Sequence, residues 1–255
     1  MIRLGILYPP TGAESEYYLY GERLADSQAP VVVSVVGVRI FGDEEEHATK
    51  YLRRTADIDN LILSAQSLRP LKPSAAVWAC TSGSFIRGPE YAEMQVDALT
   101  SLLECPVTST SLAFVSALRH LDIRRVSVLS SYPVETASVF SDFLCHHGIA
   151  LCDTVCMGLN SGPAAASLDF EQLLRVANRL DIPPRAALLV PDTAIPTMSI
   201  ISRLELALNR VVLTANQVSL WETERLAGCL NQQQDIGFLF SSRTVIDSPS
   251  DTRGA

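Results

Sequence analysis

Long apolar runs and blocks of basic residues are both absent from this sequence of 255 residues. No segment has the length of continuous apolar residues that a bilayer-spanning helix requires. The net charge is -8 at pH 7 without any cluster rich in Lys or Arg, whereas a nucleic-acid-binding protein normally has a basic face. These absences argue against a membrane protein and a nucleic-acid partner, although a locally positive site for an anionic substrate is compatible with an acidic chain.

Sequence motifs for nucleotide cofactors and for serine hydrolases are missing as well. No Walker loop, no G-x-G-x-x-G and no G-x-S-x-G sequence occurs. The first ten residues contain a short apolar run that is too short for a signal peptide and lacks a small-residue cleavage site. We therefore predict a cytoplasmic protein without a nucleotide cofactor.

The six cysteines do not have the spacing of a metal site. Cys152 and Cys156 lie in an apolar, strand-like run, and no second pair of Cys or His stands at zinc-ligand spacing. In a cytosolic chain of this length, free thiols are the expected state. The sequence predicts no metal site, and most of the cysteines are expected to be small core residues.

Short runs rich in Val, Ile and Leu alternate with amphipathic segments along most of the chain. Runs that are nearly all apolar are typical of strands buried on both faces of a parallel sheet. The predicted strands are 3–8, 30–37, 75–79, 106–109, 125–130, 149–157, 186–190 and 211–215, and the predicted helices are 13–27, 47–67, 89–104, 111–120, 134–147, 168–180, 196–208 and 217–229. Strict alternation of the two predicts an α/β fold with right-handed crossovers.

The order of strands, helices and turn motifs occurs twice. Segments 3–9 and 125–133 are both strands that end in Tyr-Pro, and segments 77–82 and 189–194 both place a reactive side chain and then Thr after a third strand. We predict two pseudo-symmetric lobes, each a short parallel sheet of about four strands flanked by helices, with the active site in the cleft between them. The predicted first lobe is 1–105 plus 210–235, the second is 106–209, and 236–255 is a partly disordered tail in which a strand at 236–240 is the alternative.

Cys80 stands directly after the third predicted strand of the first half and before the sequence Thr-Ser-Gly-Ser. In parallel sheets the carboxyl ends of the strands form the ligand crevice. The following turn can present N–H groups and hydroxyls to an anion, and the same dipoles favour a thiolate over a thiol. Cys80 is a candidate nucleophile or acid–base group, with a buried structural cysteine as the alternative.

Asp192 occupies the equivalent point of the second half, in the sequence Pro-Asp-Thr-Ala. It is a candidate acid or base opposite Cys80, or a ligand for a substrate hydroxyl or ammonium group. The alternative is an N-cap for a helix that starts near Pro196. The internal repeat favours the functional interpretation.

Other turn residues are candidates for substrate binding. The hydroxyl of Tyr132 can donate to a carboxylate, with an ordinary packed tyrosine as the alternative. Asn160 can donate an amide hydrogen bond or simply occupy a turn. The remaining candidates lie in turns that follow strands: Pro10, Thr11, Thr81, Ser82 and Thr193.

None of the four histidines follows a predicted strand. His47 comes at the end of the acidic run 43–46, which is typical of a solvated helix start. His146 and His147 precede Gly148, as at a helix C-terminus. The sequence therefore gives little support for a Cys–His catalytic pair.

Five segments together resemble the aspartate/glutamate racemase superfamily, and in particular its branch of maleate isomerase and arylmalonate decarboxylase: 5–10, 79–85 (Ala-Cys-Thr-Ser-Gly-Ser-Phe), 109–111, 131–132 and 188–196. Segments 190–194 and 213–218 are similar to the ectoine-utilisation proteins of that branch. The resemblance covers residues 2–229. It implies two pseudo-symmetric lobes with a small carboxylate substrate between them and neither a metal nor an organic cofactor.

This chain also departs from the pattern of that superfamily. Its racemases and isomerases use two cysteines, one from each lobe; Cys80 matches the first, but Asp192 stands where the second is expected. The decarboxylases keep the second cysteine and lack the first, which is the reverse arrangement. Tyr132 matches a tyrosine that binds a substrate carboxylate, Asn160 matches a family asparagine, and the turn at Thr11 lacks the asparagine found near it in maleate isomerases.

Three functions remain as alternatives. The first is an isomerase or racemase in which Cys80 and Asp192 act on opposite sides of a small dicarboxylate or amino-acid derivative, while Thr81, Ser82 and Tyr132 hold carboxylates. The second is decarboxylation of a malonate-like acid in an apolar pocket. The third is ligand binding without catalysis. A homo-oligomer is compatible with each of them.

Overall fold

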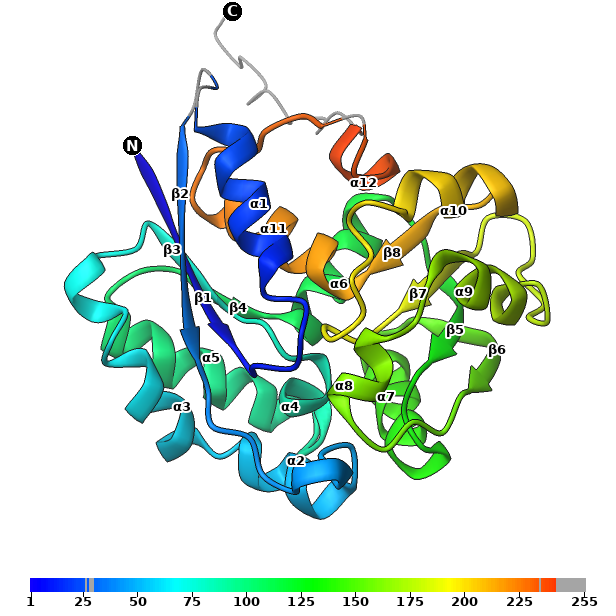
Figure 1. Ribbon diagram of the computed structural model, residues 1–255, viewed down its shortest axis with the longest axis horizontal. Coiled ribbons are helices and arrows are strands. Elements are labelled where there is room, and N and C mark those ends of the chain that lie inside the picture. The colour runs from blue at the N-terminus through cyan, green and yellow to red at the C-terminus, as the bar shows by residue number, and fades with distance from the viewer. Residues whose placement is uncertain (26, 28–29, 234, 242–255) are drawn as a thin grey trace, which may run out of the picture.

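The described residues form two separate four-stranded parallel sheets (Figure 1). The computed structural model describes residues 1–25, 27, 30–233 and 235–241. The strand order is β2-β1-β3-β4 in the first sheet and β6-β5-β7-β8 in the second, so the topology is repeated. The strands are β1 (Ile2–Tyr8), β2 (Val31–Gly37), β3 (Ala75–Trp78), β4 (Val107–Ser109), β5 (Arg125–Ser130), β6 (Ala150–Cys156), β7 (Ala187–Val190) and β8 (Val212–Thr214). The predicted α/β class and its duplicated halves are confirmed.

The inner strands β3 and β7 end just before the two predicted catalytic residues, Cys80 and Asp192. All four residues of each strand are buried. β3 pairs with β1 and β4, and β7 pairs with β5 and β8. The edge strands β2 and β6 are half-buried over most of their length. Strands covered on both faces are continuous apolar runs in the sequence, which explains why the inner strands were predictable. The half-buried edge strands are also mostly apolar, and all eight strands were predicted within two residues.

Helices join the strands and cover the sheets. They are α1 (Ser15–Leu24), α2 (Thr49–Thr55), α3 (Ile58–Ala65), α4 (Thr81–Phe85), α5 (Pro89–Leu103), α6 (Thr110–His120), α7 (Val134–His146), α8 (Gly162–Ala166), α9 (Phe170–Ala177), α10 (Ile201–Leu208), α11 (Ala215–Leu226) and α12 (Phe238–Ser241). The helix predicted over 47–67 is two helices, because Asp57 is extended and its side chain accepts from the N–H of Asp59 as the N-cap of α3. The Thr-Ser-Gly-Ser turn predicted after Cys80 is the start of α4.

The predicted lobe boundaries differ from the sheets at two strands. β4 falls in the range predicted for the second lobe, yet it pairs with β3 in the first sheet. β8 falls in the range predicted for the first lobe, yet it pairs with β7 in the second sheet. The chain returns to the first sheet in α11, which packs against α6, β3 and β4. The helix that follows the second sheet therefore connects the two halves.

The lobes meet where the carboxyl end of β1 points toward α4 and α8 (Figure 1). At this contact Gly162, the first residue of α8, faces Thr11 of the first lobe so closely that an added Cβ would lie 2.5 Å from Thr11 Cγ2. A side chain at position 162 would push the β1–α1 loop away. The glycine thus sets how near the two lobes approach beside the site.

The predicted tail is ordered as far as residue 241. Residues 238–241 form α12 rather than the alternative strand, and Ile236, Leu239 and Phe240 are buried. The Phe240 ring lies 5.9 Å from that of Tyr20 on α1. Residues 242–255 of the predicted tail lie outside the described residues.

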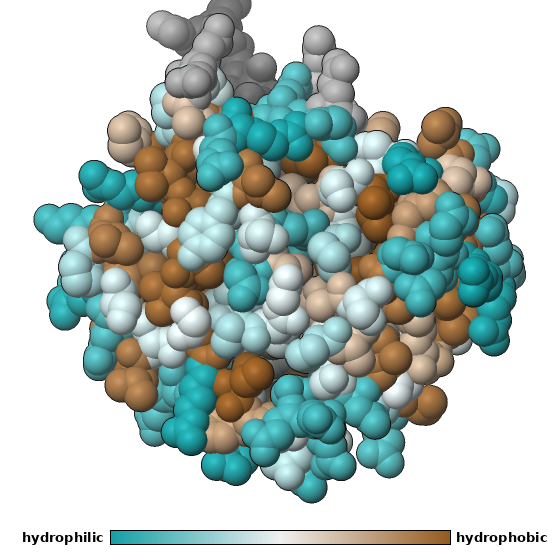
Figure 2. Space-filling view, in the orientation of Figure 1, coloured by the Kyte–Doolittle hydropathy of each residue, from teal (hydrophilic) through white to brown (hydrophobic). Residues whose placement is uncertain are grey.

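The surface mixes polar and apolar residues, which are interspersed over the face shown in Figure 2. Within the described part of the chain, no helix combines the length and the apolar composition needed to cross a bilayer.

Candidate functional site

Cys80 lies two residues beyond the end of β3, at the N-cap of α4. Its sulfur accepts a hydrogen bond from the backbone N–H of Gly83 at 3.3 Å and lies 3.8 Å from the hydroxyl oxygen of Ser82. Gly83 is required by close packing, since an added Cβ would lie 2.7 Å from the Trp78 ring and 3.0 Å from the Cys80 sulfur. The local sequence therefore fixes the thiol over the first turn of a helix.

The protonation state of Cys80 differs from the sequence-based prediction. The turn dipoles were expected to favour the thiolate, and the Gly83 hydrogen bond and Ser82 do lower the pKa of Cys80. Burial has the larger effect, and it raises the pKa of the Cys80 thiol to about 11. The group is therefore a thiol at neutral pH, because desolvation of the charged sulfur outweighs one backbone dipole.

Asp192 lies two residues beyond the end of β7, the position equivalent to Cys80. One carboxylate oxygen accepts the backbone N–H of Ala194 at 2.9 Å, and the other accepts the hydroxyl of Ser131 in a short hydrogen bond. The alternative N-cap role near Pro196 is wrong, because α10 begins only at Ile201. The carboxylate is 97% buried and is held in one orientation from both sides.

The loops around Asp192 are tied to both lobes. The Tyr8 hydroxyl, from the end of β1, donates to the carbonyl oxygen of Thr193 at 3.0 Å. The amide of Asn216, on α11, donates to the same oxygen at 3.1 Å. The Tyr132 hydroxyl, from the repeat position of Tyr8, donates to the carbonyl oxygen of Pro191 at 2.8 Å. Two equivalent tyrosines thus hold the backbone on either side of Asp192.

His47 is a site residue that the sequence did not reveal. It was predicted at a solvated helix start, yet it is 95% buried and its Nε2 lies 3.8 Å from a carboxylate oxygen of Asp192. Its Nδ1 lies 2.9 Å from the carbonyl oxygen of Leu159, which can only accept, so Nδ1 carries a proton and Nε2 faces Asp192. The backbone of His47 is held by Asn160 and Thr136 of the second lobe.

A buried cavity of about 30 Å³ brings these groups together. Among the predicted residues, Cys80, Asp192, Thr11, Ser82 and Thr193 line it. The cavity is also lined by residues that were not predicted as site residues: Pro9, Ile40, Glu46, His47, Leu52, Thr55 and Ala194. This volume accommodates water rather than a carboxylic acid, so the cavity has to widen to admit a substrate.

Four predicted binding residues do not line the cavity in this structure. Pro10 is exposed, and Thr81 is fully buried beside the wall. The Tyr132 hydroxyl is buried and donates to Pro191, and its burial raises the pKa of this phenol well above the usual range. Asn160 is exposed and contributes its backbone carbonyl to His47 instead of its side chain to the cavity. Their proposed contacts with substrate stay predictions.

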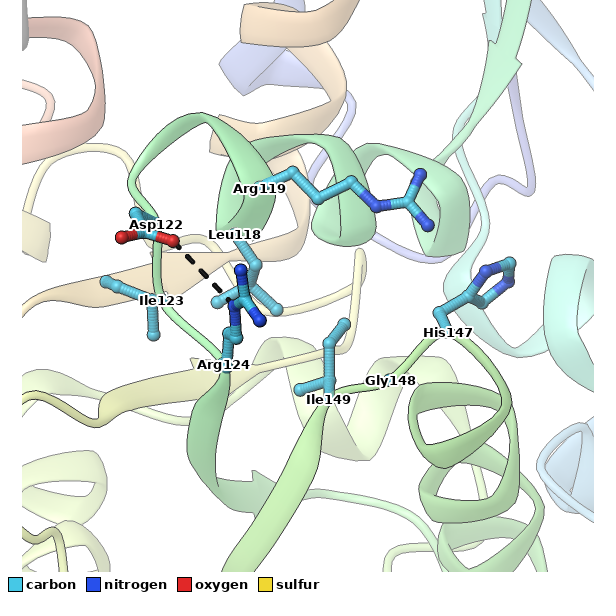
Figure 3. Close-up of a pocket in the computed structure, with 8 residues that line it drawn as sticks. All are labelled: Leu118, Arg119, Asp122, Ile123, Arg124, His147, Gly148 and Ile149. Atoms are coloured by element: carbon cyan, nitrogen blue, oxygen red, sulfur yellow. Dashed lines mark ion pairs between the residues drawn. The ribbon is translucent and has the colours of Figure 1, made fainter.

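A wider pocket of about 290 Å³ lies at the amino ends of β5 and β6, away from the carboxyl ends of the strands that carry the candidate site (Figure 3). Its charged groups include Arg119, Arg124 and Asp122, and Arg124 pairs with Asp122 at 3.8 Å in an almost fully exposed ion pair. Exposed ion pairs of this kind contribute little and are not fixed in position. We therefore place the chemistry at the smaller, buried cavity. No group of three metal-ligating side chains is arranged around an ion position anywhere in the described residues.

Comparisons with known proteins agree with the duplicated fold. The family profile of arylmalonate decarboxylase matches residues 53–240. The arylmalonate decarboxylase of Bordetella bronchiseptica is 26% identical over 177 residues, which are 68% of this chain and 73% of that protein. A Nocardia farcinica maleate cis-trans isomerase, solved as a cysteine-to-serine variant with a covalently bound succinylcysteine intermediate, superposes with a TM-score of 0.84 at 18% identity, covering 94% and 98% of the two chains. A doubly substituted arylmalonate decarboxylase in a liganded form superposes with a TM-score of 0.77 at 22% identity, covering 94% and 99%.

Proposed function

Because the chain belongs to the arylmalonate decarboxylase family, we propose that it is a cofactor-independent isomerase or racemase of a small carboxylate, with Cys80 and Asp192 on opposite sides of the substrate. The observation that carries this proposal is the shared cavity: the two side chains occupy equivalent positions in the two lobes and line one buried space. A carbon held between them is within reach of a proton-transfer group on each face.

The protonation states suggest which group acts in which direction. Cys80 is a thiol at neutral pH, so it is ready to donate a proton. His47 Nε2, beside Asp192, is ready to accept one when the imidazole is neutral. We expect the imidazole to do the proton transfer, because both carboxylate oxygens of Asp192 already accept hydrogen bonds. The Leu159 carbonyl orients the ring through Nδ1–H, and Asp192 stabilises the imidazolium that forms when Nε2 takes a proton.

One turnover can then be written with its protons balanced. The base on the Asp192 side takes the proton from the carbon next to the carboxylate, and the bonding electrons move into that carboxylate as an enediolate. The S–H bond of Cys80 breaks as its proton passes to the opposite face of the carbon, and the sulfur keeps the electron pair as a thiolate. The reverse reaction starts from the thiolate and the protonated His47. The asymmetry of the two groups predicts unequal rates in the two directions.

Covalent catalysis by Cys80 is the variant of this mechanism for a double bond. The succinylcysteine of the Nocardia farcinica isomerase is a thioether adduct in that protein. Here the equivalent step needs the Cys80 proton to leave first, and His47 with Asp192 is the base that lines the same cavity. When the Cys80 thiolate adds to one alkene carbon, the π electrons move to the other carbon and into its carboxylate as an enediolate. Rotation about the resulting C–C single bond, return of these electrons and cleavage of the C–S bond would then give the other isomer and regenerate the thiolate.

A decarboxylase is the second candidate function, favoured by two features of the cavity. Ile40, Leu52 and Pro9 give it apolar walls, which promote loss of carbon dioxide from a desolvated carboxylate. The Cys80 thiol can protonate the enediolate that remains. In this reaction His47 would not need to remove a proton from carbon.

A single experiment separates these reactions. The protein is incubated in heavy water with small dicarboxylates, malonates and amino acids, including amino acids derived from ectoine, and proton NMR is recorded over time. Solvent exchange at carbon, double-bond isomerisation and loss of a carboxyl group give different signals. Turnover that persisted at the original rate after Cys80→Ala would contradict the proposal, and binding without any turnover would identify a non-catalytic relative.

A further inference from the structure

Glu46 brings a second carboxylate into the cavity that contains Asp192. It follows the short 3₁₀ turn Asp43–Glu45, is 91% buried and lines the cavity wall. Its Oε2 is buried and has no hydrogen-bond partner among the described residues. The hydroxyl of Thr55, also on the cavity wall, is likewise buried and unpaired. Buried polar atoms normally find partners, so this wall is complementary to a ligand that has hydrogen-bond donors.

The backbone beside Glu46 is held in place. The N–H of His47 donates to the Asn160 carbonyl at 2.9 Å, and the carbonyl of His47 accepts the Thr136 hydroxyl at 2.9 Å. These bonds fasten the segment to the second lobe, so Glu46 stays buried although the three acidic residues before it are exposed. Because the backbone is fixed, the Glu46 carboxylate cannot simply turn out to solvent as its acidic neighbours do.

The charges around the cavity are unbalanced. Glu46 and Asp192 are its two carboxylates, Cys80 is a thiol at neutral pH, and none of the lining residues is Lys or Arg. Two of the three cations on α2 lie over aromatic rings: Lys50 over the Tyr51 ring at 4.5 Å and Arg54 over the Phe41 ring at 4.2 Å. His47 is the only other titratable group on the wall. Buried carboxylates without a cation are unfavourable, and a doubly negative ligand would add to that repulsion.

We propose that the substrate carries a cationic nitrogen as well as its carboxylate, and that Glu46, assisted by Thr55, binds this nitrogen. This inference rests on the proposed function, because it assigns the substrate class of the same cavity: a small amino acid or a related zwitterion rather than a simple dicarboxylate. An ammonium group has three N–H donors, enough to pair both unpartnered oxygens. Its positive charge would offset one of the two carboxylates.

The test uses pairs of acids that differ only in the amino group: alanine and propionate, aspartate and succinate, phenylglycine and phenylacetate. Binding is measured by calorimetry and by the rise of Tm at millimolar ligand. We expect at least one amino acid, in one of its enantiomers, to bind about 10- to 100-fold more tightly than its partner without nitrogen, which is the range for a charged hydrogen bond. Equal binding within every pair, or no binding by either member of all three, would overturn the proposal.

Glu46→Gln keeps the size of the side chain and removes its charge, and it should abolish this preference. Binding of the amino acid should weaken, and binding of the nitrogen-free acid should become tighter because one negative charge no longer faces it. Glu44→Gln, two residues away on the exposed acidic turn, is the matched control and should leave the preference intact. Circular dichroism and Tm show whether the Glu46→Gln protein is folded; if it is not, the paired comparison with the natural protein still decides.

The outcomes also separate this inference from the proposed function. A Cys80-dependent turnover of nitrogen-free acids, without any preference for amino acids, would overturn the substrate class and keep the enzyme. A Glu46-dependent preference for amino acids without turnover would keep the binding site and overturn the catalytic proposal.

Discussion

The two lobes place their central side chain at the same position, two residues after an inner strand, yet they hold it in different ways. Cys80 is held by its own loop, through the N–H of Gly83. Asp192 also accepts a local N–H, that of Ala194, but its carboxylate and its neighbouring carbonyls are fixed in addition by distant residues: Tyr8, Ser131, Tyr132 and Asn216. A buried charge requires more compensating hydrogen bonds than a buried thiol. The repeat therefore conserves position, while the chemistry of each side chain determines how much of the fold is needed to support it.

The largest effect on turnover is expected when either Cys80 or Asp192 loses its functional group, and this tests whether the two lobes act on opposite faces of the substrate. Cys80→Ala and Asp192→Asn should each reduce turnover by roughly 10³-fold, because each face of the substrate loses its proton-transfer group or the carboxylate that supports it. The two variants should differ in which enantiomer or direction retains solvent exchange in heavy water. Cys105→Ala is the control, since Cys105 lies in the same apolar cluster without lining the cavity. Identical residual exchange in both variants would contradict opposite faces.

His47→Gln should reduce kcat by about 10²- to 10³-fold, because glutamine can form a hydrogen bond but cannot carry the proton. The limb of the pH–rate profile that reports the base should disappear or shift, a change that a merely structural role would not produce. His146→Gln, at an exposed position, should leave the profile unchanged. If His47→Gln retained the natural profile, Asp192 itself would be the base.

The stability of the hydrogen-bond network beside Asp192 should depend on pH, because Glu16 is part of this network. Its carboxylate accepts the Asn216 amide at 2.7 Å, and burial raises the pKa of Glu16 to about 7 despite that hydrogen bond and the one from the Met198 N–H. The folded protein holds this proton up to about pH 7, whereas the unfolded chain loses it near the ordinary value of 4.5. The free energy of unfolding should therefore fall as pH rises through this window, by up to about 3 kcal/mol, and level off above it.

Urea unfolding at a series of pH values measures this slope. Glu16→Gln should remove the contribution, and Glu22→Gln, exposed on the same helix, should not. An unchanged slope in the Glu16→Gln protein would assign the pH dependence to other buried acids, of which Glu205 and Glu224 also have raised pKa values because of burial.

The smallest expected effects come from the equivalent tyrosines. Tyr132→Phe removes one hydrogen bond to a carbonyl beside Asp192 and should lower the free energy of unfolding by about 1 kcal/mol. Tyr8→Phe removes the equivalent bond and also the bonds of its hydroxyl with Thr11 and with the N–H of Ala13, so its cost should be larger, about 2 kcal/mol. Tyr18→Phe, with 48% of its surface exposed, is the control. If Tyr132 instead binds a substrate carboxylate, as its family match predicts, Tyr132→Phe should raise KM far more than Tyr8→Phe does.

The parts of the fold that could be predicted from the sequence are those in which neighbouring residues alone signal that a segment is buried. The strands were evident because each is an apolar run, and Cys80 and Asp192 were evident because each follows an inner strand of a repeated pattern. Glu46 and His47 were missed because the acidic run before them is exposed and dominates the local pattern. What buries His47 is a contact with Leu159, 112 residues away, and no local pattern signals such a contact. The same limit applies to β4 and β8, whose sheet membership depends on long-range pairing.

The small size of the cavity has a consequence for the timing of catalysis. Five of its twelve lining residues come from segment 40–55, and His47 is one of them. His47 is bound to Asn160 and Thr136 of the lobe that carries Asp192, so a widening that moves its backbone has to break these bonds. Such a movement separates the imidazole from Asp192, and the open form is then unreactive. Chemistry and substrate passage then alternate, and turnover that slows as solvent viscosity is raised with sucrose would show that the protein's own opening sets the pace.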